Sequence, residues 1–441
     1  MNAHLLQVLR IVIRADSDPA RQALFANLRQ SRLTVGLAYA LHERLRGTRP
    51  AALLVAGYGL ACFLGITPPR NRRARVLAAA THENARRQVA RVVSWMGPAD
   101  ADWVQRRRRG RPRLSDLSKA LGLLSPARLS RAFRIIGRVG RGHGFLVACR
   151  VASAIAWYAR AAAIVAAHRP GAVLVSSDSN PEELGFAGAA RACGIPQVFV
   201  SHAFPTPFSP PLNFSLSILE GDAAVRARRQ RGPIAGTVLL AGLEGDSAPL
   251  DAGRFDRGNP VIGICAPKAV SWPTLAAIVD DCRRHFHARQ IVIRWHPSRL
   301  DPARRIHRLG DLTGIVQTPR TALLEKMVRQ CDWVIADENS NVHLPVLKLG
   351  VPTIAVRHLG LYPDSRSDLY GFAAGGIIFP PVSSIREVQP EALSAFFAEG
   401  WPARFRQYDA AYLQPQDGIG TEVRRAISRL LDEVAPNARY A

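Results

Sequence analysis

Acidic side chains are scarce in the first 170 residues of this 441-residue chain. That part holds 30 Lys and Arg against 7 Asp and Glu, whereas residues 171–441 hold 29 against 27. The formal net charge of +25 therefore belongs almost wholly to the first part, and it excludes an ordinary acidic enzyme. A hydrophobic content of 48% excludes a largely disordered protein. The length suits two domains, at most three, each large enough to bury a core.

The chain also lacks the spacings that bind metals or pair cysteines. No C-x-x-C occurs, so we expect reduced, buried thiols at the six cysteines, Cys62, Cys149, Cys193, Cys265, Cys282 and Cys331. There is no G-x-x-x-x-G-K-[ST], no G-x-G-x-x-G after a strand, no H-E-x-x-H and no clear D-x-D pair. These absences disfavour metal-dependent phosphate chemistry. We expect neither a metal nor a resident cofactor.

Uninterrupted apolar runs of about 20 residues are lacking as well. Arg10 and Arg14 interrupt the apolar stretch near the N-terminus, so we expect no secretory signal and a cytoplasmic location. The run at 51–66 is flanked by arginines but is shorter than the roughly 20 residues that a spanning helix needs. We expect a buried strand that enters a glycine turn near Val55, or a core helix, with an interfacial segment as the alternative. Residues 151–167 are expected to form a long core helix.

The residue pattern differs between the first part of the chain and the rest. Residues 100–145 are dense in arginine and predict a loop at 105–116 and a basic amphipathic helix at 128–144. From residue 171 onward, short apolar strands alternate with helices across turns of two to six residues. This pattern predicts an α/β fold with parallel sheets covered on both faces. The polar stretch at 242–260 is the candidate linker.

We therefore expect two Rossmann-like domains that face a cleft. The first, 1–245, would be a basic acceptor-side domain. The second, 246–441, would bind the nucleotide donor, and its last helix could pack back on the first domain.

Polar residues that directly follow strands are the candidates for chemistry, because ligands bind at the carboxyl ends of strands in open α/β sheets. Asp178 follows the strand at 172–175, and Glu183 lies in the first turn of the next helix, so either could supply a carboxylate base. For Asp178 the alternative is an Asx cap of that helix. His202 ends the next strand and could act as a general base or as a hydrogen-bond donor to a phosphate, with a structural role as the alternative.

Two further strand ends carry cationic side chains. Alternation along IVIRWHP predicts that Arg294 and His296 point to the same face, where they could bind a diphosphate and stabilise its departing charge. A salt bridge under the sheet is the alternative for Arg294. Lys268, with Ser271, follows the strand VIGICAP and could also meet a phosphate.

The turn at 337–341 contains Asp337, Asn339 and Ser340 before a helix expected to begin near Val342. Asn339 or Ser340 would cap this helix. The N–H groups and the hydroxyl at its N-terminus would then form an anion site. A capped helix without a ligand is the alternative.

In their order along the chain, these turns resemble the GT-B glycosyltransferases of bacterial surface-polysaccharide synthesis, the group of capsule, Kdo and polysialic acid transferases and teichoic acid glycerophosphotransferases. The resemblance covers about 171–430. GIPQVFVSHAFP resembles the strand that ends in a His, where Ala203 replaces the usual Gly. IRWHP resembles the HP motif, and ADENSNVHLPVLKLGVPTI is similar to the Asp-x-Ser-Ser turn, helix and G-x-P strand, with Asn339 where a hydroxyl residue is commoner. PQDGIGTEVRRAISRLL resembles the closing helix.

The resemblance implies metal-independent transfer of a sugar or polyol phosphate from a nucleotide-activated donor to a growing surface polysaccharide or lipid-linked acceptor. His202, Asp178 or Glu183 would deprotonate the acceptor hydroxyl. The remaining candidates would bind the donor: Lys268, Arg294, His296, Asp337, Asn339 and Ser340. The basic first part would dock on the anionic inner face of the cytoplasmic membrane or hold a polyanionic acceptor.

Two other functions fit parts of the sequence. The arginines of residues 1–170 could contact a nucleic-acid backbone, but aromatic residues are sparse there and no known nucleic-acid-binding motif is present, so we expect no nucleic-acid partner. A non-catalytic polysaccharide-assembly protein of the same fold is the second alternative. Donor turnover separates an enzyme from such a protein.

Overall fold

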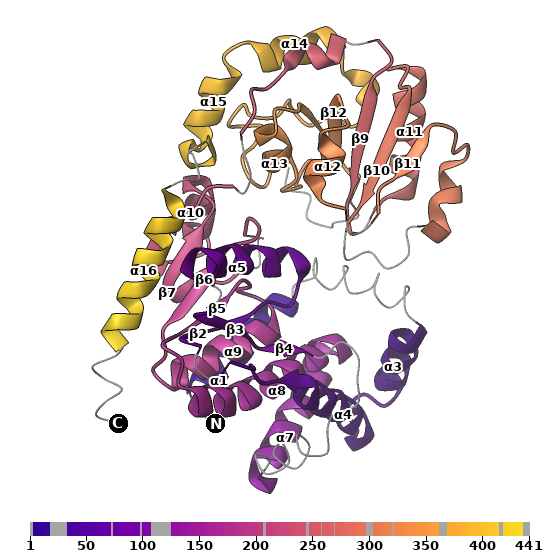
Figure 1. The fold of residues 1–441 in the computed structure, drawn as a ribbon. Helices are drawn as coiled ribbons and strands as arrows, with labels where there is room; N and C mark the ends of the chain where they lie inside the picture. The colour runs from indigo at the N-terminus through magenta and orange to yellow at the C-terminus, as the bar shows by residue number, and fades with distance from the viewer. Residues whose placement is uncertain are drawn as a thin grey trace. The chain divides into compact units, whose positions relative to one another are not determined.

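The chain forms two compact units in a computed structural model (Figure 1). Unit 1 comprises Met1–Glu220, Ala224–Ala241 and Asp417–Ala441, and unit 2 comprises Gly221–Ala223 and Gly242–Gln416. The structure describes residues 3–17, 33–71, 74–97, 99–106, 125–205, 209–243, 247–256, 258–268, 270–296, 303–319, 322–360, 368–413 and 418–434. The expected loop at 105–116 lies mostly outside these residues.

Unit 1 is built on a six-stranded sheet in which every neighbouring pair is parallel. The order is β3-β2-β5-β6-β7-β8. The strands are β2 (Val76–Ala79), β3 (Ala101–Trp103), β5 (Ala172–Val175), β6 (Gln197–Val200), β7 (Asn213–Leu219) and β8 (Ala235–Leu240). Parallel strands need crossover connections, and the apolar residues of β2, β5 and β6 are buried, as is typical of a sheet covered on both faces.

Helices cover both faces of this sheet. On one face α5 (Glu83–Met96) and α16 (Ile419–Val434) pack together, with Val89 and Val423 fully buried in one cluster with β2 and β5. On the other, α9 (Pro181–Ala192) contacts β5 and β6. The segment expected as a closing helix is thus α16, and it belongs to unit 1. Strands β1 (Ile66–Thr67) and β4 (Gln105–Arg106) form a separate antiparallel pair.

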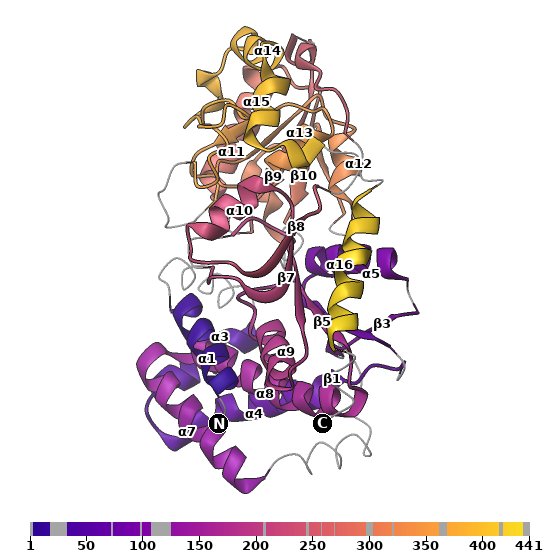
Figure 2. The ribbon, with the colours of Figure 1, turned by 90° about the vertical axis from the view of Figure 1, so that its left-hand side faces the viewer.

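A second helical layer packs on α9. Helix α8 (Phe145–His168) contacts α9, α4 (Arg49–Gly65), α7 (Pro126–His143) and α1 (Ala3–Asp16), and α3 (Leu33–Arg44) joins α4 and α8. Both ribbon views show this group of helices side by side (Figures 1 and 2). Among the described residues, α8 is the one helix long and apolar enough to cross a membrane by length and composition. It forms the expected long core helix.

Of the two forms expected for the run at 51–66, the structure has the helix and not the strand near Val55, because α4 is helical from Arg49 to Gly65. Thr48 caps it by accepting a hydrogen bond from the Ala51 N–H, and Pro50 occupies its first turn. Gly59 does not mark a turn. A Cβ at Gly59 would lie 3.1 Å from the Cβ of Ala152, so this glycine permits close packing of α4 on α8.

Unit 2 has a five-stranded sheet of order β11-β10-β9-β12-β13, again with every neighbouring pair parallel. The strands are β9 (Val261–Ala266), β10 (Gln290–Trp295), β11 (Ile315–Gln317), β12 (Trp333–Asp337) and β13 (Thr353–Val356). The helices are α11 (Trp272–Arg284), α12 (Leu324–Val328), α13 (His343–Lys348), α14 (Pro390–Ala398) and α15 (Trp401–Tyr408). The two sheets confirm the expected pair of Rossmann-like domains.

Short elements complete the part of the chain that the structure describes. These are α10 (Asp222–Arg229) and the 3-10 turns η1 (Ala252–Asp256), η2 (Ala303–Leu309), η3 (Ile385–Glu387) and η4 (Ala410–Leu413). All six cysteines are free, but only four are buried. Cys193 is exposed because it lies at the end of α9, so the expectation of a buried thiol is wrong there.

Candidate functional site

The strand order indicates where each sheet can bind a ligand. In unit 1 the direction of strand addition reverses between β2 and β5, and in unit 2 it reverses between β9 and β12. Ligands of doubly wound sheets bind beyond the carboxyl ends of the strands at this reversal, because the loops there separate to opposite faces. The residues that follow these four strands, and those that follow the neighbouring strands β6 and β10, are therefore the candidate site residues.

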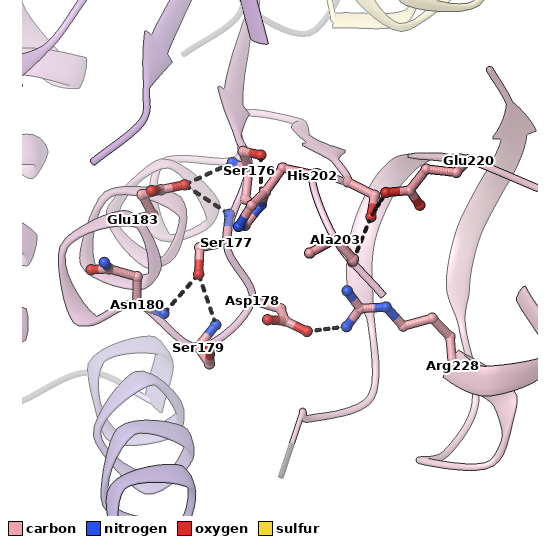
Figure 3. Close-up of polar contacts among 11 residues, drawn as sticks. Ser176, Ser177, Asp178, Ser179, Asn180, Glu183, His202, Ala203, Glu220 and Arg228 are labelled. Carbon is pink, nitrogen blue, oxygen red and sulfur yellow. Dashed lines mark hydrogen bonds and ion pairs between the residues drawn. The ribbon is translucent and has the colours of Figure 1, made fainter. Parts of the chain in front are cut away.

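Glu183 holds together the two strand ends at the reversal of unit 1. Its side chain is fully buried, and one oxygen accepts hydrogen bonds of 2.7 Å from the N–H groups of Ser176 and Ser177 (Figure 3). The other oxygen accepts bonds of 2.9 and 2.8 Å from the N–H and hydroxyl of Thr81, which follows β2. All four bonds come from unit 1. This geometry gives Glu183 a structural function at the end of β2 and β5.

His202 has one ring nitrogen fixed by the backbone. Its Nδ1 lies 2.6 Å from the carbonyl oxygen of Ser176 and 3.1 Å from the Ser176 hydroxyl, which itself donates to the Val200 carbonyl. A carbonyl oxygen can only accept, so Nδ1 must carry the hydrogen. In the neutral ring the lone pair is then on Nε2, the nitrogen that a general base uses.

Asp178 lies in the same turn and forms a buried ion pair with Arg228 of α10 (Figure 3). The guanidinium also lies over the Phe199 ring, 5.2 Å from its centroid. The Asx cap offered as the alternative for Asp178 is wrong. Asn180 caps α9 instead, because its Oδ1 accepts a 2.9 Å hydrogen bond from the Glu182 N–H. The turn has more polar residues than the cap needs, and only the fold shows which one reaches the helix.

Sequence reasoning missed three residues beside this turn. Thr81 and His82 follow β2, a four-residue strand inside the arginine-rich part that the α/β pattern did not reveal. The Asn180 amide donates to the Thr81 hydroxyl at 2.8 Å and lies 3.3 Å from His82 Nε2. Glu220 follows β7 and accepts a 2.9 Å hydrogen bond from the Ser201 hydroxyl (Figure 3). Its position directly after an apolar strand was the signal available.

Asp337 ends β12 at the reversal of unit 2. One carboxylate oxygen accepts a 2.7 Å hydrogen bond from the Gly360 N–H, and the other accepts one of 3.2 Å from the Asn339 N–H. Burial raises the pKa of this carboxyl above its ordinary value, and the two N–H groups oppose that rise. The Asp337 carboxylate thus shapes the turn by binding backbone N–H groups of two other residues.

The expected cap of the following helix is wrong. Helix α13 has only six residues, its N-cap is Val342, and no side chain caps it. The Asn339 side chain accepts instead from the Leu369 N–H at 2.9 Å, and the Ser340 hydroxyl accepts from the Val342 N–H at 3.3 Å. The helix is too short for an N-terminal anion site, so any ligand contact of Ser340 would come from its hydroxyl.

The cationic candidates of unit 2 lie at neighbouring strand ends. Arg294 pairs in register with Cys265 of β9, and His296 directly follows β10. Both side chains are half-buried, as is Lys268, two residues after β9. Ser271 has a different function, since its hydroxyl caps α11 at the Thr274 N–H. The structure therefore brings Arg294, His296 and Lys268 to one edge of the sheet.

His343 is a buried histidine that sequence reasoning did not select. Its Nε2 lies 3.0 Å from the Asp337 carbonyl oxygen and must donate to it, so Nδ1 accepts from the Thr353 hydroxyl at 3.0 Å. Burial lowers its pKa from 6.5 to about 4. The neutral ring links the end of β12 to β13 and supports the Asp337 turn.

We expect His343 to make unit 2 less stable in acid. Between pH 6.5 and about 4 the unfolded chain binds a proton at this residue and the folded chain does not, so stability falls as the pH falls through this window. The loss is about 3 kcal/mol, from about 1.4 kcal/mol per pKa unit. Urea unfolding at several pH values should show a shallower pH dependence for His343→Gln. Parallel curves would contradict the assignment. Asp337, whose pKa is raised, acts with the opposite sign in both proteins.

No protein-family model matches the chain, and no curated protein matches it by sequence. Among solved structures it is similar to the calicheamicin glycosyltransferase CalG4, at 14% identity and a TM-score of 0.49, over 82% of this chain and 100% of that one. It is also similar to a UDP-N-acetylglucosamine 2-epimerase from Rickettsia bellii, at 13% identity and a TM-score of 0.47, over 83% of this chain and 99% of that one. The similarity to MurG of Acinetobacter baumannii has 13% identity and a TM-score of 0.42, over 80% of this chain and 99% of that one.

Within the described ranges, no group of three or more His, Cys, Asp or Glu side chains is placed to hold a metal ion. Three carboxylates at the two candidate edges are instead paired: Asp178 with Arg228, and Glu183 and Asp337 with backbone N–H groups.

Proposed function

We propose that this protein is a glycosyltransferase that moves a sugar, or a polyol phosphate, from a nucleotide-activated donor to a hydroxyl of a bacterial surface polysaccharide or its lipid-linked precursor. The observation that supports this most directly is His202, whose Nδ1–H is held by the Ser176 carbonyl at the carboxyl edge of a parallel sheet. This arrangement presents Nε2 as a base. The order of the motifs in residues 171–430 resembles that of glycosyltransferases, and this resemblance supports transfer from a nucleotide-activated donor as the reaction.

In the proposed reaction His202 Nε2 takes the proton of the acceptor hydroxyl. The acceptor oxygen forms a bond to the donor carbon, or to phosphorus for a polyol phosphate. The bond from that atom to the nucleotide phosphate breaks, and its electron pair leaves with the nucleotide. Glu183 serves as a positioning residue, since its oxygens are occupied by four hydrogen bonds that fix the Ser176 turn. We assign no base function to Asp178, because it is paired with Arg228.

Unit 2 would bind the nucleotide. Arg294 and His296 can donate to phosphate oxygens and stabilise the charge that develops on the leaving group, and Lys268 adds a cation at the adjacent strand. Asp337, Asn339 and Ser340 would shape the turn against the donor, with the Ser340 hydroxyl as the direct contact. The proposed transfer needs no metal, because these cations supply the charge that a metal otherwise provides.

The acceptor would lie at the inner face of the cytoplasmic membrane. Five arginines of α7 are exposed and separated by three or four residues, so they occupy one face of the helix: Arg128, Arg131, Arg134, Arg138 and Arg141. Anionic lipids attract such a face by about 1 kcal/mol per basic residue. This supports a peripheral membrane location for a protein whose acceptor is lipid-linked.

Nucleotide binding tests the proposal. We expect one of CMP, CDP, UDP and GDP to raise the melting temperature, since a ligand at 100 times its Kd adds about 2.7 kcal/mol of stability. We expect His296→Ala to weaken that binding at least about tenfold, which is about 1.4 kcal/mol. His307→Ala is the matched control, because His307 is exposed in η2. Equal nucleotide affinity in His296→Ala would contradict the assigned donor site.

Turnover separates an enzyme from a non-catalytic assembly protein. Purified protein incubated with the nucleotide sugar that binds best should release free nucleotide, slowly to water and faster when an acceptor is added. Binding without any release would favour the assembly protein.

A further inference from the structure

An apolar cavity of about 590 Å³ lies among α4, α7 and α8 of unit 1. These three helices lie side by side in the second helical layer (Figure 2). Pockets that hold small organic ligands have volumes of about 300–1,000 Å³, so the space suits a ligand. It belongs to the helical layer, and neither His202 nor Glu183 lines it.

The walls of the cavity are almost entirely hydrocarbon. Alanines of α8, among them Ala156 and Ala159, line it together with Phe63 of α4 and Phe133 of α7, and among the described lining residues only Arg128 and Ser130 have polar side chains. Such a surface cannot satisfy the hydrogen bonds of a polar ligand. A hydrocarbon chain placed there gains about 25 cal/mol for each Å² removed from water.

The edge of the cavity combines exposed leucines with positive charge. Leu60 and Leu129 line it and are 41% and 47% exposed, and Leu53, on the same helix as Leu60, is 60% exposed. Arg128 also lines it and begins the exposed arginine row of α7, a helix without any acidic residue. Exposed apolar side chains beside a row of cations suit the boundary between lipid chains and anionic headgroups.

We propose that this cavity binds one acyl chain of an anionic membrane phospholipid while the arginines of α7 contact lipid phosphates. The inference deepens the proposed function and rests on it for the membrane-bound acceptor. It adds a site: a single lipid would hold the protein at the bilayer through a buried chain as well as through surface charge. Charge attraction alone is reversed by salt, whereas a buried chain is not.

The test uses the full chain and a fluorescent probe, dansylaminoundecanoic acid. We expect the probe to bind and to be displaced by lysophosphatidylglycerol. In Ala159→Trp, which fills the cavity from α8, we expect the affinity of the probe to fall at least tenfold. Ala132→Phe, which fills it from α7, should give the same loss and serves if the first variant does not fold. Ala167→Trp is the matched control, because Ala167 is an exposed residue of α8 outside the cavity.

The charge is tested in the same assay. We expect Arg128→Gln with Arg131→Gln to remove the preference for lysophosphatidylglycerol over lysophosphatidylcholine, whereas Arg284→Gln, on the exposed surface of α11, should leave it unchanged. Unchanged probe affinity in the filled variants would overturn the proposal. Displacement by farnesyl phosphate at least tenfold better than by lysophosphatidylglycerol would also overturn it, since the occupant would then be an isoprenyl chain.

Nucleotide thermal shifts measured on the same variants keep the two proposals apart. If Ala159→Trp loses the acyl probe and no nucleotide binds to any protein, the lipid site stands and the proposed transferase fails. If the nucleotide shift is present and all filled variants retain the probe, the transferase stands and the lipid site fails.

Discussion

Replacing His202 by Gln is expected to lower the rate of sugar transfer by a factor of about 10² to 10⁴, the usual contribution of a positioned general base. The physical reason is that Nε2 is the one ring nitrogen left for the acceptor proton once Nδ1 donates to the Ser176 carbonyl. Glutamine retains the polarity of the side chain but offers no comparable base. The measurement is the single-turnover rate with saturating donor, which isolates the transfer step from donor binding.

Two controls sharpen this experiment. The nucleotide thermal shift of His202→Gln should equal that of the unmodified protein, because the donor is assigned to unit 2. His307→Gln controls for the loss of any histidine and should transfer at the normal rate. A His202→Gln rate within threefold of normal would show that another group is the base. In that case Glu220, whose Oε2 is buried without a hydrogen bond in the described part of the chain, would be the next residue to replace.

Glu183→Ala is expected to destabilise the protein by about 4 kcal/mol or more. Four donors, three of them backbone N–H groups near the ends of β2 and β5, lose their acceptor, and each buried donor left unsatisfied costs about 1–3 kcal/mol. Because a domain is stable by only about 5–15 kcal/mol, this one change consumes much of the total. Urea unfolding followed by circular dichroism measures it.

The control for Glu183→Ala is Glu422→Ala, an exposed carboxylate in the first turn of α16 that should cost less than about 1 kcal/mol. Glu183→Gln decides between structure and catalysis. A structural Glu183 predicts lower stability for this variant, because the amide N–H₂ cannot accept the hydrogen bonds that one carboxylate oxygen accepted. Full stability with transfer abolished would instead identify Glu183 as the catalytic base.

The C-terminal three fifths of the fold could be predicted from the sequence because its strands are short, apolar and separated by clear turns. The strand at 172–175, helix α9 closed by Gly194, and strands β9, β10, β12 and β13 all follow this pattern. Gly194 has a φ of +72°, a conformation in which a glycine readily ends a helix. Local patterns suffice where each element is buried on both faces by neighbours close in the chain.

The first 170 residues could not be predicted in the same way. Strand β2 has only four residues and is completed by pairing with β5, almost a hundred residues later. The run at 51–66 reads equally as strand or helix, because a continuous apolar run has no period to distinguish them. Its helical form is supported by Thr48 and by the packing of Gly59 against Ala152, and that contact is formed only in the folded chain.

The same division holds for the site. By itself the sequence determined where the charge lies and which polar residues end the strands, because composition and strand period are local properties. Tertiary structure decided what each residue does: Glu183 is saturated by backbone donors, Asp178 is paired with Arg228, and His202 has one nitrogen fixed. These functions depend on partners that are distant in the chain. A buried polar group must be hydrogen-bonded, and only the folded structure determines which partner it has.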